Sequence, residues 1–272
     1  MYIMITSVCN MSCAHCCMSC GKNYKGQHME QYIYDACLRM AGEYGDTITL
    51  GGGEPTLHPQ FNKYLAQAIQ ADQNHDIGCI PWFATNGSNT KKTLALMYAS
   101  VDCEYYDEYS FIYDHACISY TGEPLFYMAV SQDQYHDPID PVVFETAKKL
   151  DIEIRNTSHN ISKTGHASHG DGNICSCETV QVKPDGSMYL CGCDEAPYLG
   201  NVYEEPDLEM LNSMGSGRCV KYIDEDCVEA FKDVDMNNTN SAWVYKNIPI
   251  KAGKEHHPDT HREPLEIYKE AC

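Results

Sequence analysis

The segment Cys9-Asn10-Met11-Ser12-Cys13-Ala14-His15-Cys16 decides how the rest of this 272-residue chain is interpreted. It places thiols at a C-x3-C-x2-C spacing, and cysteine thiolates are the usual ligands of iron–sulfur clusters. Four thiolates would close a [4Fe–4S] cluster, whereas three leave one iron open to bind another molecule. The spacing therefore indicates a cluster that reacts at its open iron, held by Cys9, Cys13 and Cys16.

Two further cysteines, Cys17 and Cys20, follow this segment at once. They make a zinc knuckle an alternative, because Cys13/Cys16 and Cys17/Cys20 both have the C-x2-C spacing of structural zinc sites. The segment by itself leaves the two kinds of metal site open.

The cysteine content favours a reducing compartment. The chain has 16 cysteines, many of them in CxxC and CxC groups, and the stretch before Cys9 is too short for the apolar part of a signal peptide. Reduced cysteines that serve metal sites in a cytosol fit this pattern better than a secreted disulfide scaffold does. We expect a cytoplasmic protein, and no apolar run reaches the roughly 18 residues of a membrane span.

The net charge of −20 comes from 39 acidic and 19 basic residues. Such a surface repels phosphate backbones, so broad binding of nucleic acid is not expected. A local basic groove stays open, and solubility is the simplest interpretation of the acidity.

Strand and helix patterns alternate along the first 172 residues. We expect strands at 2–6, 47–50, 79–85, 125–131 and 152–156, and helices at 30–44, 61–71, 91–99 and 141–150. This alternation predicts a parallel sheet covered by helices, with function at the carboxyl ends of the strands. The acidic, tyrosine-rich residues 102–115 interrupt the pattern and are expected to form a connecting loop.

A run of glycines follows the second expected strand, in Gly51-Gly52-Gly53-Glu54-Pro55. Backbone without side chains can approach a ligand closely. The carboxylate of Glu54 is then presented at the carboxyl end of a strand.

The pattern of the sequence changes near residue 172, where we place a domain boundary. Residues 179–182 and 187–190 alternate like strands around a Lys183–Gly186 turn, which predicts a β-hairpin. Two C-x-C pairs flank this hairpin and indicate a metal site at its open end, with zinc and an iron–sulfur cluster both possible occupants: Cys175, Cys177, Cys191 and Cys193. The polar segment 241–272 is expected to be a solvated tail. His159, His166 and His169 lie in a polar loop and could suggest a metal site, but surface histidines are the preferred interpretation.

Four of these motifs together resemble the radical S-adenosylmethionine (radical SAM) superfamily. The cysteine segment matches that family's cluster loop, and Gly51–Pro55 is similar to its Gly-Gly-Glu motif. The segments Ala84–Gly87 and Ser131–His136 resemble the ends of its third and fourth strands. These matches stand in the right order at strand ends and cover roughly residues 1–165.

The resemblance implies a partial (β/α)6 TIM-like barrel. It also implies a [4Fe–4S] cluster on the three cysteines of the loop, whose open iron is chelated by S-adenosylmethionine. The resemblance further implies that Glu54, with nearby backbone, holds the methionine ammonium, and a carboxylate suits an ammonium in a dehydrated cleft. The other cofactor-binding residues that the resemblance implies are Gly52, Gly53, Thr85, Asn86, Ser131, Asp133 and Asn156.

The C-terminal part resembles the SPASM or twitch extension of many of these enzymes. Cys175, Gly186 and Cys191 fit the opening pattern of that extension, but the later cysteine run of a full SPASM domain is not found. This resemblance implies a core at 1–172, a shortened cysteine-rich extension at 173–240, and a tail at 241–272. The extension would hold at most one auxiliary iron–sulfur cluster, or zinc. Cys175 and Cys191 are the favoured ligands, and the remaining positions are open among Cys177, Cys193, Cys219 and Cys227.

The implied reaction is reductive cleavage of S-adenosylmethionine to a 5′-deoxyadenosyl radical, which takes a hydrogen atom from the substrate. The substrate would be a peptide, a small molecule or a nucleoside, and the electron donor a flavodoxin- or ferredoxin-type protein. Three alternatives stay open: a glycyl-radical-activating enzyme, a radical enzyme that modifies a nucleic-acid base, and a non-catalytic metal-stapled binding protein. Tyr127, Tyr135 and Cys117 are candidate hydrogen donors or acceptors, and nothing in the sequence selects among them.

Overall fold

The computed structural model of the protein describes residues 1–44, 47–74, 80–101, 124–156, 165–166, 180–189, 192, 196 and 198–204. Strands and helices alternate through most of this part, which confirms the α/β prediction. The order is β1 (Tyr2–Thr6), α1 (Gln31–Tyr44), β2 (Thr49–Gly52), the 3-10 helix η1 (Pro55–Leu57), α2 (Phe61–Gln73), β3 (Trp82–Thr85), α3 (Thr90–Val101), β4 (Tyr127–Ser131), α5 (Pro141–Lys149) and β5 (Glu153–Arg155).

Three further strands complete the sheet: β6 (Gln181–Val182), β7 (Ser187–Tyr189) and β8 (Tyr198–Asn201). The strand order is β5-β4-β3-β2-β1-β6-β7-β8. Strands β1 to β5 pair in parallel, and β6 also pairs in parallel with β1, through Tyr2 and Gln181. The pairs β6–β7 and β7–β8 are antiparallel, so the predicted hairpin is confirmed. β8 was not expected as a strand from the sequence.

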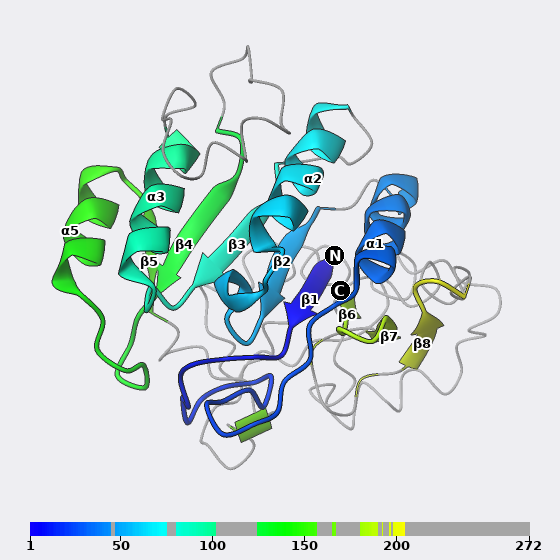
Figure 1. The fold of residues 1–272 in the computed structure, drawn as a ribbon, viewed down its shortest axis with the longest axis horizontal. Coiled ribbons are helices and arrows are strands. Elements are labelled where there is room, and N and C mark those ends of the chain that lie inside the picture. The colour runs from blue at the N-terminus through cyan, green and yellow to red at the C-terminus, as the bar shows by residue number, and fades with distance from the viewer. Residues whose placement is uncertain are drawn as a thin grey trace, which may run out of the picture.

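The hydrophobic core lies between the sheet and its helices, and α1, α2, α3 and α5 lie on the same side of the sheet (Figure 1). Alternate strand residues supply the sheet's share of this core, such as Ile3 and Ile5 on β1, both fully buried. Phe83 of β3 meets Phe61 of α2 edge to face, with ring centroids 5.1 Å apart. These four helices therefore do not cover the opposite face of the strands (Figure 1).

Both ends of α5 follow from its local sequence. In α5, the side chain of Asp140 accepts a hydrogen bond from the backbone N–H of Val142 at 3.1 Å, and Pro141 occupies the first turn. Lys148 and Lys149 lie in the last turn, where positive charge is favourable.

Several predictions fall outside the described residues, namely the loop at 102–115, the tail at 241–272, and Cys175, Cys177, Cys191 and Cys193. The closure of a partial barrel and the domain boundary near residue 172 stay predictions. None of the helices in the described part of the chain combines the length and the hydropathy needed to span a bilayer.

Candidate functional site

Residues at the carboxyl ends of β2, β3, β4 and β5 border a cavity of about 560 Å³, which also reaches the first residues of β1, β2 and β3. The loop that follows β1, residues 7–28, lies beside this edge and is called the cluster loop below (Figure 1). The cavity lining brings together most of the residues singled out from the sequence: Cys9, Cys13, Cys16, Gly52, Gly53, Glu54, Thr85, Asn86 and Ser131. Function at this edge of a parallel sheet is the general rule for the architecture.

Hydrogen bonds close the cluster loop at its base. Ser7 donates its backbone N–H to the carbonyl of Gln27 at 2.9 Å, and Gln27 donates its own N–H to the hydroxyl of Ser7 at 2.8 Å. The hydroxyl of Thr6 and Nδ1 of His28 are 2.9 Å apart. A loop tied at both ends to β1 can hold its cysteines in one place although it has no regular structure.

The thiols of Cys9, Cys13 and Cys16 border the same cavity and are partly buried. Burial raises the pKa of Cys9, and burial together with the neighbouring thiols raises the pKa of Cys13 to about 11. Thiols crowded in this way carry their protons unless a cation is bound among them, because a metal ligand must be a thiolate. The donor set therefore fits a metal cluster.

Cys16 differs from the other two thiols. The neighbouring thiol of Cys20 and the backbone N–H groups of Cys20 and Met18 lower the pKa of Cys16 to about 6. Cys20 itself is buried, and the thiol of Cys16 together with this burial raises its pKa. Gly165 and His166 also lie against this turn, where His166 donates its backbone N–H to the carbonyl of Cys16 at 2.9 Å.

Gly51, Gly52 and Gly53 are required because other parts of the chain pack directly against their backbone. Gly51 lies under the ring of Tyr2, whose hydroxyl accepts the backbone N–H of Gly52 at 2.9 Å. Gly52 has a φ of +151°, which residues with side chains rarely adopt. A Cβ on Gly53 would lie 2.5 Å from the carbonyl oxygen of Val8 and 2.9 Å from the Cβ of Cys9. The glycines let β1 and the cluster loop pack directly on β2.

Glu54 is buried at the centre of a hydrogen-bond network that joins the ends of β2 and β3. Its Oε1 accepts the backbone N–H of Thr56 at 3.1 Å, the hydroxyl of Thr56 at 2.5 Å and the hydroxyl of Thr85 at 2.8 Å. Its Oε2 accepts the backbone N–H of Asn86 at 2.7 Å. Burial nevertheless raises the pKa of Glu54, because these bonds offset only part of the cost of desolvating a carboxylate.

Asn86 connects this network to the cluster loop. Its side-chain amide donates to Oδ1 of Asn10 at 3.0 Å, and the amide of Asn10 donates to the hydroxyl of Ser88 at 2.7 Å. The loop is thus fixed to the end of β3 as well as to β1. These hydrogen bonds join the carboxylate of Glu54, the side-chain amides of Asn86 and Asn10, and the loop that carries the cysteines.

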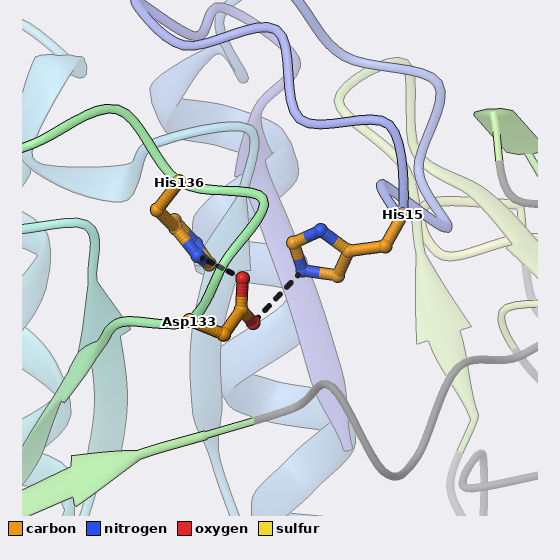
Figure 2. Close-up of side chains that lie close together, drawn as sticks. All are labelled: His15, Asp133 and His136. Carbon is orange, nitrogen blue, oxygen red and sulfur yellow. Dashed lines mark hydrogen bonds and ion pairs between the residues drawn. The ribbon is translucent and has the colours of Figure 1, made fainter.

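Asp133 binds two histidines at the end of β4 (Figure 2). One of its carboxylate oxygens lies 2.9 Å from Nδ1 of His136 and accepts the backbone N–H of Tyr135 at 2.9 Å, while the other lies 3.5 Å from Nε2 of His15. His15 stands between Cys13 and Cys16 in the sequence, so this contact ties the cluster loop to β4. Three such ligand atoms within 4.8 Å of one another could also hold a metal ion.

The structure does not place every predicted residue in the cavity lining. Asp133 and Asn156 are described but lie outside the lining, whereas Tyr2, Trp82, His136 and Arg155 belong to it and were not assigned to the site from the sequence. Tyr2 and Trp82 occupy strand positions opposite the core-facing residues, and that alternation was the signal available for them. Cys17 and Cys20 also line the cavity, together with Gly192, which stands between Cys191 and Cys193 in the sequence.

Comparisons with known proteins agree with this site. Residues 3–102 match the family described as the Radical SAM superfamily. The chain is similar to the mycofactocin maturase MftC of Mycobacterium ulcerans (strain Agy99), with 34% identity over 102 residues, and to that of Mycobacterium tuberculosis (strain ATCC 25618 / H37Rv), with 33% identity over 101 residues. These matches cover 36% of this chain and about a quarter of the length of the relatives (25% and 24%).

A solved structure is also similar, that of BtrN in complex with AdoMet and 2-DOIA. It matches with a TM-score of 0.49 and 15% identity, over 75% of this chain and 78% of that one. The residues that match the Radical SAM superfamily, 3–102, include the cluster loop, Glu54 and Asn86.

Proposed function

We propose that this chain is a radical SAM enzyme that cleaves S-adenosylmethionine reductively to a 5′-deoxyadenosyl radical and abstracts a hydrogen atom from its substrate. The observation that carries the proposal is that Cys9, Cys13, Cys16 and the Glu54 network border a single cavity. A purely structural metal site would need the thiols and would have no use for a buried carboxylate beside them. The similarity to the MftC maturases over 36% of this chain supports the shared chemistry.

The cluster would be held by Cys9, Cys13 and Cys16. When bound, the cluster and S-adenosylmethionine together supply the electron and the carbon radical that the reaction needs. The part of the protein is to hold these groups in place and to exclude water and competing hydrogen donors. The ties of the cluster loop to β1, β3 and β4 serve that purpose.

Glu54 is suited to hold the methionine ammonium. A carboxylate oxygen has two lone pairs, and Oε2, which accepts the N–H of Asn86, can accept an ammonium N–H as well. The pKa of Glu54 is raised by burial, and a positive charge beside it would favour the ionised form. In this proposal Gly52, Gly53, Thr85, Asn86 and Ser131 complete the pocket, while Asp133 and Asn156 contribute from outside its lining.

The finer assignments extend the proposal. The C-terminal cysteines Cys175, Cys177, Cys191 and Cys193 would hold an auxiliary iron–sulfur cluster or zinc. The electron would come from a flavodoxin- or ferredoxin-type donor. The substrate would be a peptide, a small molecule or a nucleoside, and the net charge of −20 disfavours a nucleic acid.

The test is cleavage of S-adenosylmethionine by the full chain. The protein would be reconstituted with iron and sulfide without oxygen, reduced with dithionite, and assayed for methionine and 5′-deoxyadenosine by mass spectrometry. We expect both products from the wild type and neither from Cys13→Ala. A matched control is Cys37→Ala, because Cys37 is buried in α1 within the hydrophobic core and should not affect cleavage per cluster. A wild type that takes up zinc and no iron, and yields neither product, would contradict the proposal.

A further inference from the structure

The cavity described above has a second region, at the amino ends of the strands. Tyr2, Thr49 and Trp82 are the first residues of β1, β2 and β3, and they pair in register from strand to strand. Gln181 of β6 pairs with Tyr2 on its other side. All four residues line the cavity. Residues in register on neighbouring strands point to the same face of a sheet, so these four form one continuous row across it.

Arg155 of β5 lies over one end of this row. Its guanidinium carbon is 5.0 Å from the centre of the Trp82 ring, although β4 separates their two strands in the sheet. Both residues line the cavity. A guanidinium stacked on an indole ring is attracted to it and held in a defined plane, so its N–H groups are oriented before a ligand binds.

The acidic neighbour of Arg155 does not use up its hydrogen-bonding capacity. Nε of Arg155 lies 3.8 Å from Oε1 of Glu153, which is too far for a hydrogen bond, and the two side chains are 39% and 59% exposed. An exposed pair of this kind contributes little to stability. A guanidinium has five N–H donors in a planar fork that matches two oxygens of one anion. Arg155 can therefore bind a ligand anion in the cavity.

The charges of the cavity lining favour an anion with a single negative charge. Among the described residues of the lining, Arg155 is the one arginine or lysine, whereas Glu54 and Glu153 are acidic. A phosphate dianion would bring two negative charges to one cation and close to Glu153. A carboxylate brings one charge, and its two oxygens match the fork of the guanidinium. The arrangement therefore suits a carboxylate.

The position of Trp82 separates this carboxylate from the methionine part of S-adenosylmethionine. That part is assigned to Glu54, which accepts the N–H of Asn86 just beyond the end of β3. Trp82 begins β3, so its backbone stands roughly 13 Å from that of Asn86 along the strand. The ammonium and carboxylate of methionine are bonded to the same carbon and lie much closer together than that. The carboxylate at Arg155 would therefore belong to the substrate.

We propose that Arg155, stacked on Trp82, binds a carboxylate of the substrate, which is a small carboxylic acid or a peptide that presents a carboxylate. The proposal rests on the function proposed above and names the substrate class of the same cavity. A substrate held at Arg155 can extend along the row toward the cluster loop. That loop reaches the other end of the row, where Nε2 of Gln181 donates to Sδ of Met18 at 3.0 Å.

The experiment measures the binding of matched acids and amides to the reconstituted full chain by ligand-observed nuclear magnetic resonance. The small probes are 3-phenylpropionate and 3-phenylpropionamide, and the peptide probes are N-acetyl-tetraalanine with a free and with an amidated C-terminus. The wild type is compared with Arg155→Met, which removes the charge, and with Arg155→Lys, which keeps it. Arg39→Met is the matched control, because Arg39 is exposed on α1 and outside the cavity lining. The Kd of S-adenosylmethionine is measured for each protein in parallel.

We expect the wild type and Arg39→Met to bind at least one acid roughly tenfold to a hundredfold more tightly than its amide, the range for one charge-assisted pair. Arg155→Met should lose this preference. Arg155→Lys should keep part of it, because an ammonium is a point charge without the planar fork. The Kd of S-adenosylmethionine should be the same in all four proteins. A preference for the small acid would indicate a free carboxylic acid as the substrate, and a preference confined to the peptide acid would indicate a peptide carboxylate.

Equal binding of acids and amides, or no binding of any probe, would overturn the proposal, and so would an unchanged preference in Arg155→Met. Weaker binding of S-adenosylmethionine to Arg155→Met would assign Arg155 to the cofactor and would overturn it as well. A failure of the underlying function is distinguishable, because the wild type would then release no 5′-deoxyadenosine while the preference for acids that depends on Arg155 remained. Release of 5′-deoxyadenosine without that preference would contradict the carboxylate site alone.

Discussion

Replacing Glu54 with glutamine and with alanine tests whether its buried carboxylate organises the site through its acceptor geometry or through its charge. Gln can keep the three bonds made to Oε1, but its NH2 group faces the N–H of Asn86, which loses its acceptor. A buried donor without a partner costs about 1–3 kcal/mol, and removal of a desolvated charge offsets part of this cost. We therefore expect Glu54→Gln to lower the free energy of unfolding by about 1–2 kcal/mol.

Glu54→Ala removes all four bonds. It leaves two buried backbone N–H groups, those of Thr56 and Asn86, without their acceptor and opens a small cavity, so we expect a loss of about 3–5 kcal/mol. The difference between the two variants separates acceptor geometry from charge.

The pH dependence of the free energy of unfolding tests the role of Glu54 independently. The pKa of Glu54 is raised in the folded protein by burial, so between the ordinary value of 4.5 and the folded value the folded state binds more protons than the unfolded state. Stability contributed by this group is therefore fully present at acidic pH and falls as the pH rises through that window. Glu54→Gln should lack this part of the pH slope.

The assay is urea unfolding of the metal-free protein under reducing, oxygen-free conditions at several pH values. The free energies of unfolding are compared between variants whose unfolding has the same dependence on urea concentration. Glu43→Gln is the control, because Glu43 is exposed on α1 and should change stability by less than about 0.5 kcal/mol. Equal losses in Glu54→Gln and Glu54→Ala would refute the reasoning, since the charge and not the acceptor geometry would then hold the network together. A loss below about 1 kcal/mol in Glu54→Ala would refute the network itself.

Three other predictions concern the cluster loop and its support. Gly53→Ala should lower both stability, by about 1–3 kcal/mol, and iron content, because the new methyl group would meet the loop backbone; normal loading and unfolding would contradict the packing described. Tyr2→Phe removes the acceptor for one backbone N–H and should cost about 1–2 kcal/mol in urea unfolding with iron content unchanged; a loss of iron would instead make Tyr2 part of the metal site. Substituting Cys9, Cys13 and Cys16 together should lower iron from about eight to about four atoms per chain by metal analysis and Mössbauer spectra if the C-terminal cysteines hold a second cluster, or from about four to zero with zinc retained if they do not; an unchanged iron content would contradict a cluster on these three cysteines.

The regular elements were predictable from the sequence because they follow from local patterns. The apolar spacing in α1 and the β-rich run of β1 depend on a few neighbouring residues, and both lie within a residue or so of their expected bounds. Glu54 was also predictable as a site residue, since a strand followed by glycines places it at the carboxyl edge. Its four hydrogen bonds were not, because two of the donors come from the end of β3, about thirty residues away.

For the glycine run, the sequence predicted the residues but not the reason for them. The sequence suggested that Gly51–Gly53 make room for a ligand, whereas in the structure Tyr2, Val8 and Cys9 fill the space that side chains there would need. The contact of Asp133 with His15 likewise joins segments more than a hundred residues apart. Such contacts depend on how strands stack in space, and the sequence pattern carries no direct record of that stacking.

The pairing of β6 with β1 bears on how the protein can be divided. β1 lies inside the sheet, with β2 on one side and β6 on the other, and Tyr2 donates its N–H to the carbonyl of Val180 at 2.8 Å. A chain shortened at residue 172 would keep the cluster loop but leave β1 as a bare edge strand, open to pairing with other molecules. Such a fragment would then self-associate through this exposed edge, and it would aggregate even though all cysteines of the cluster loop are intact.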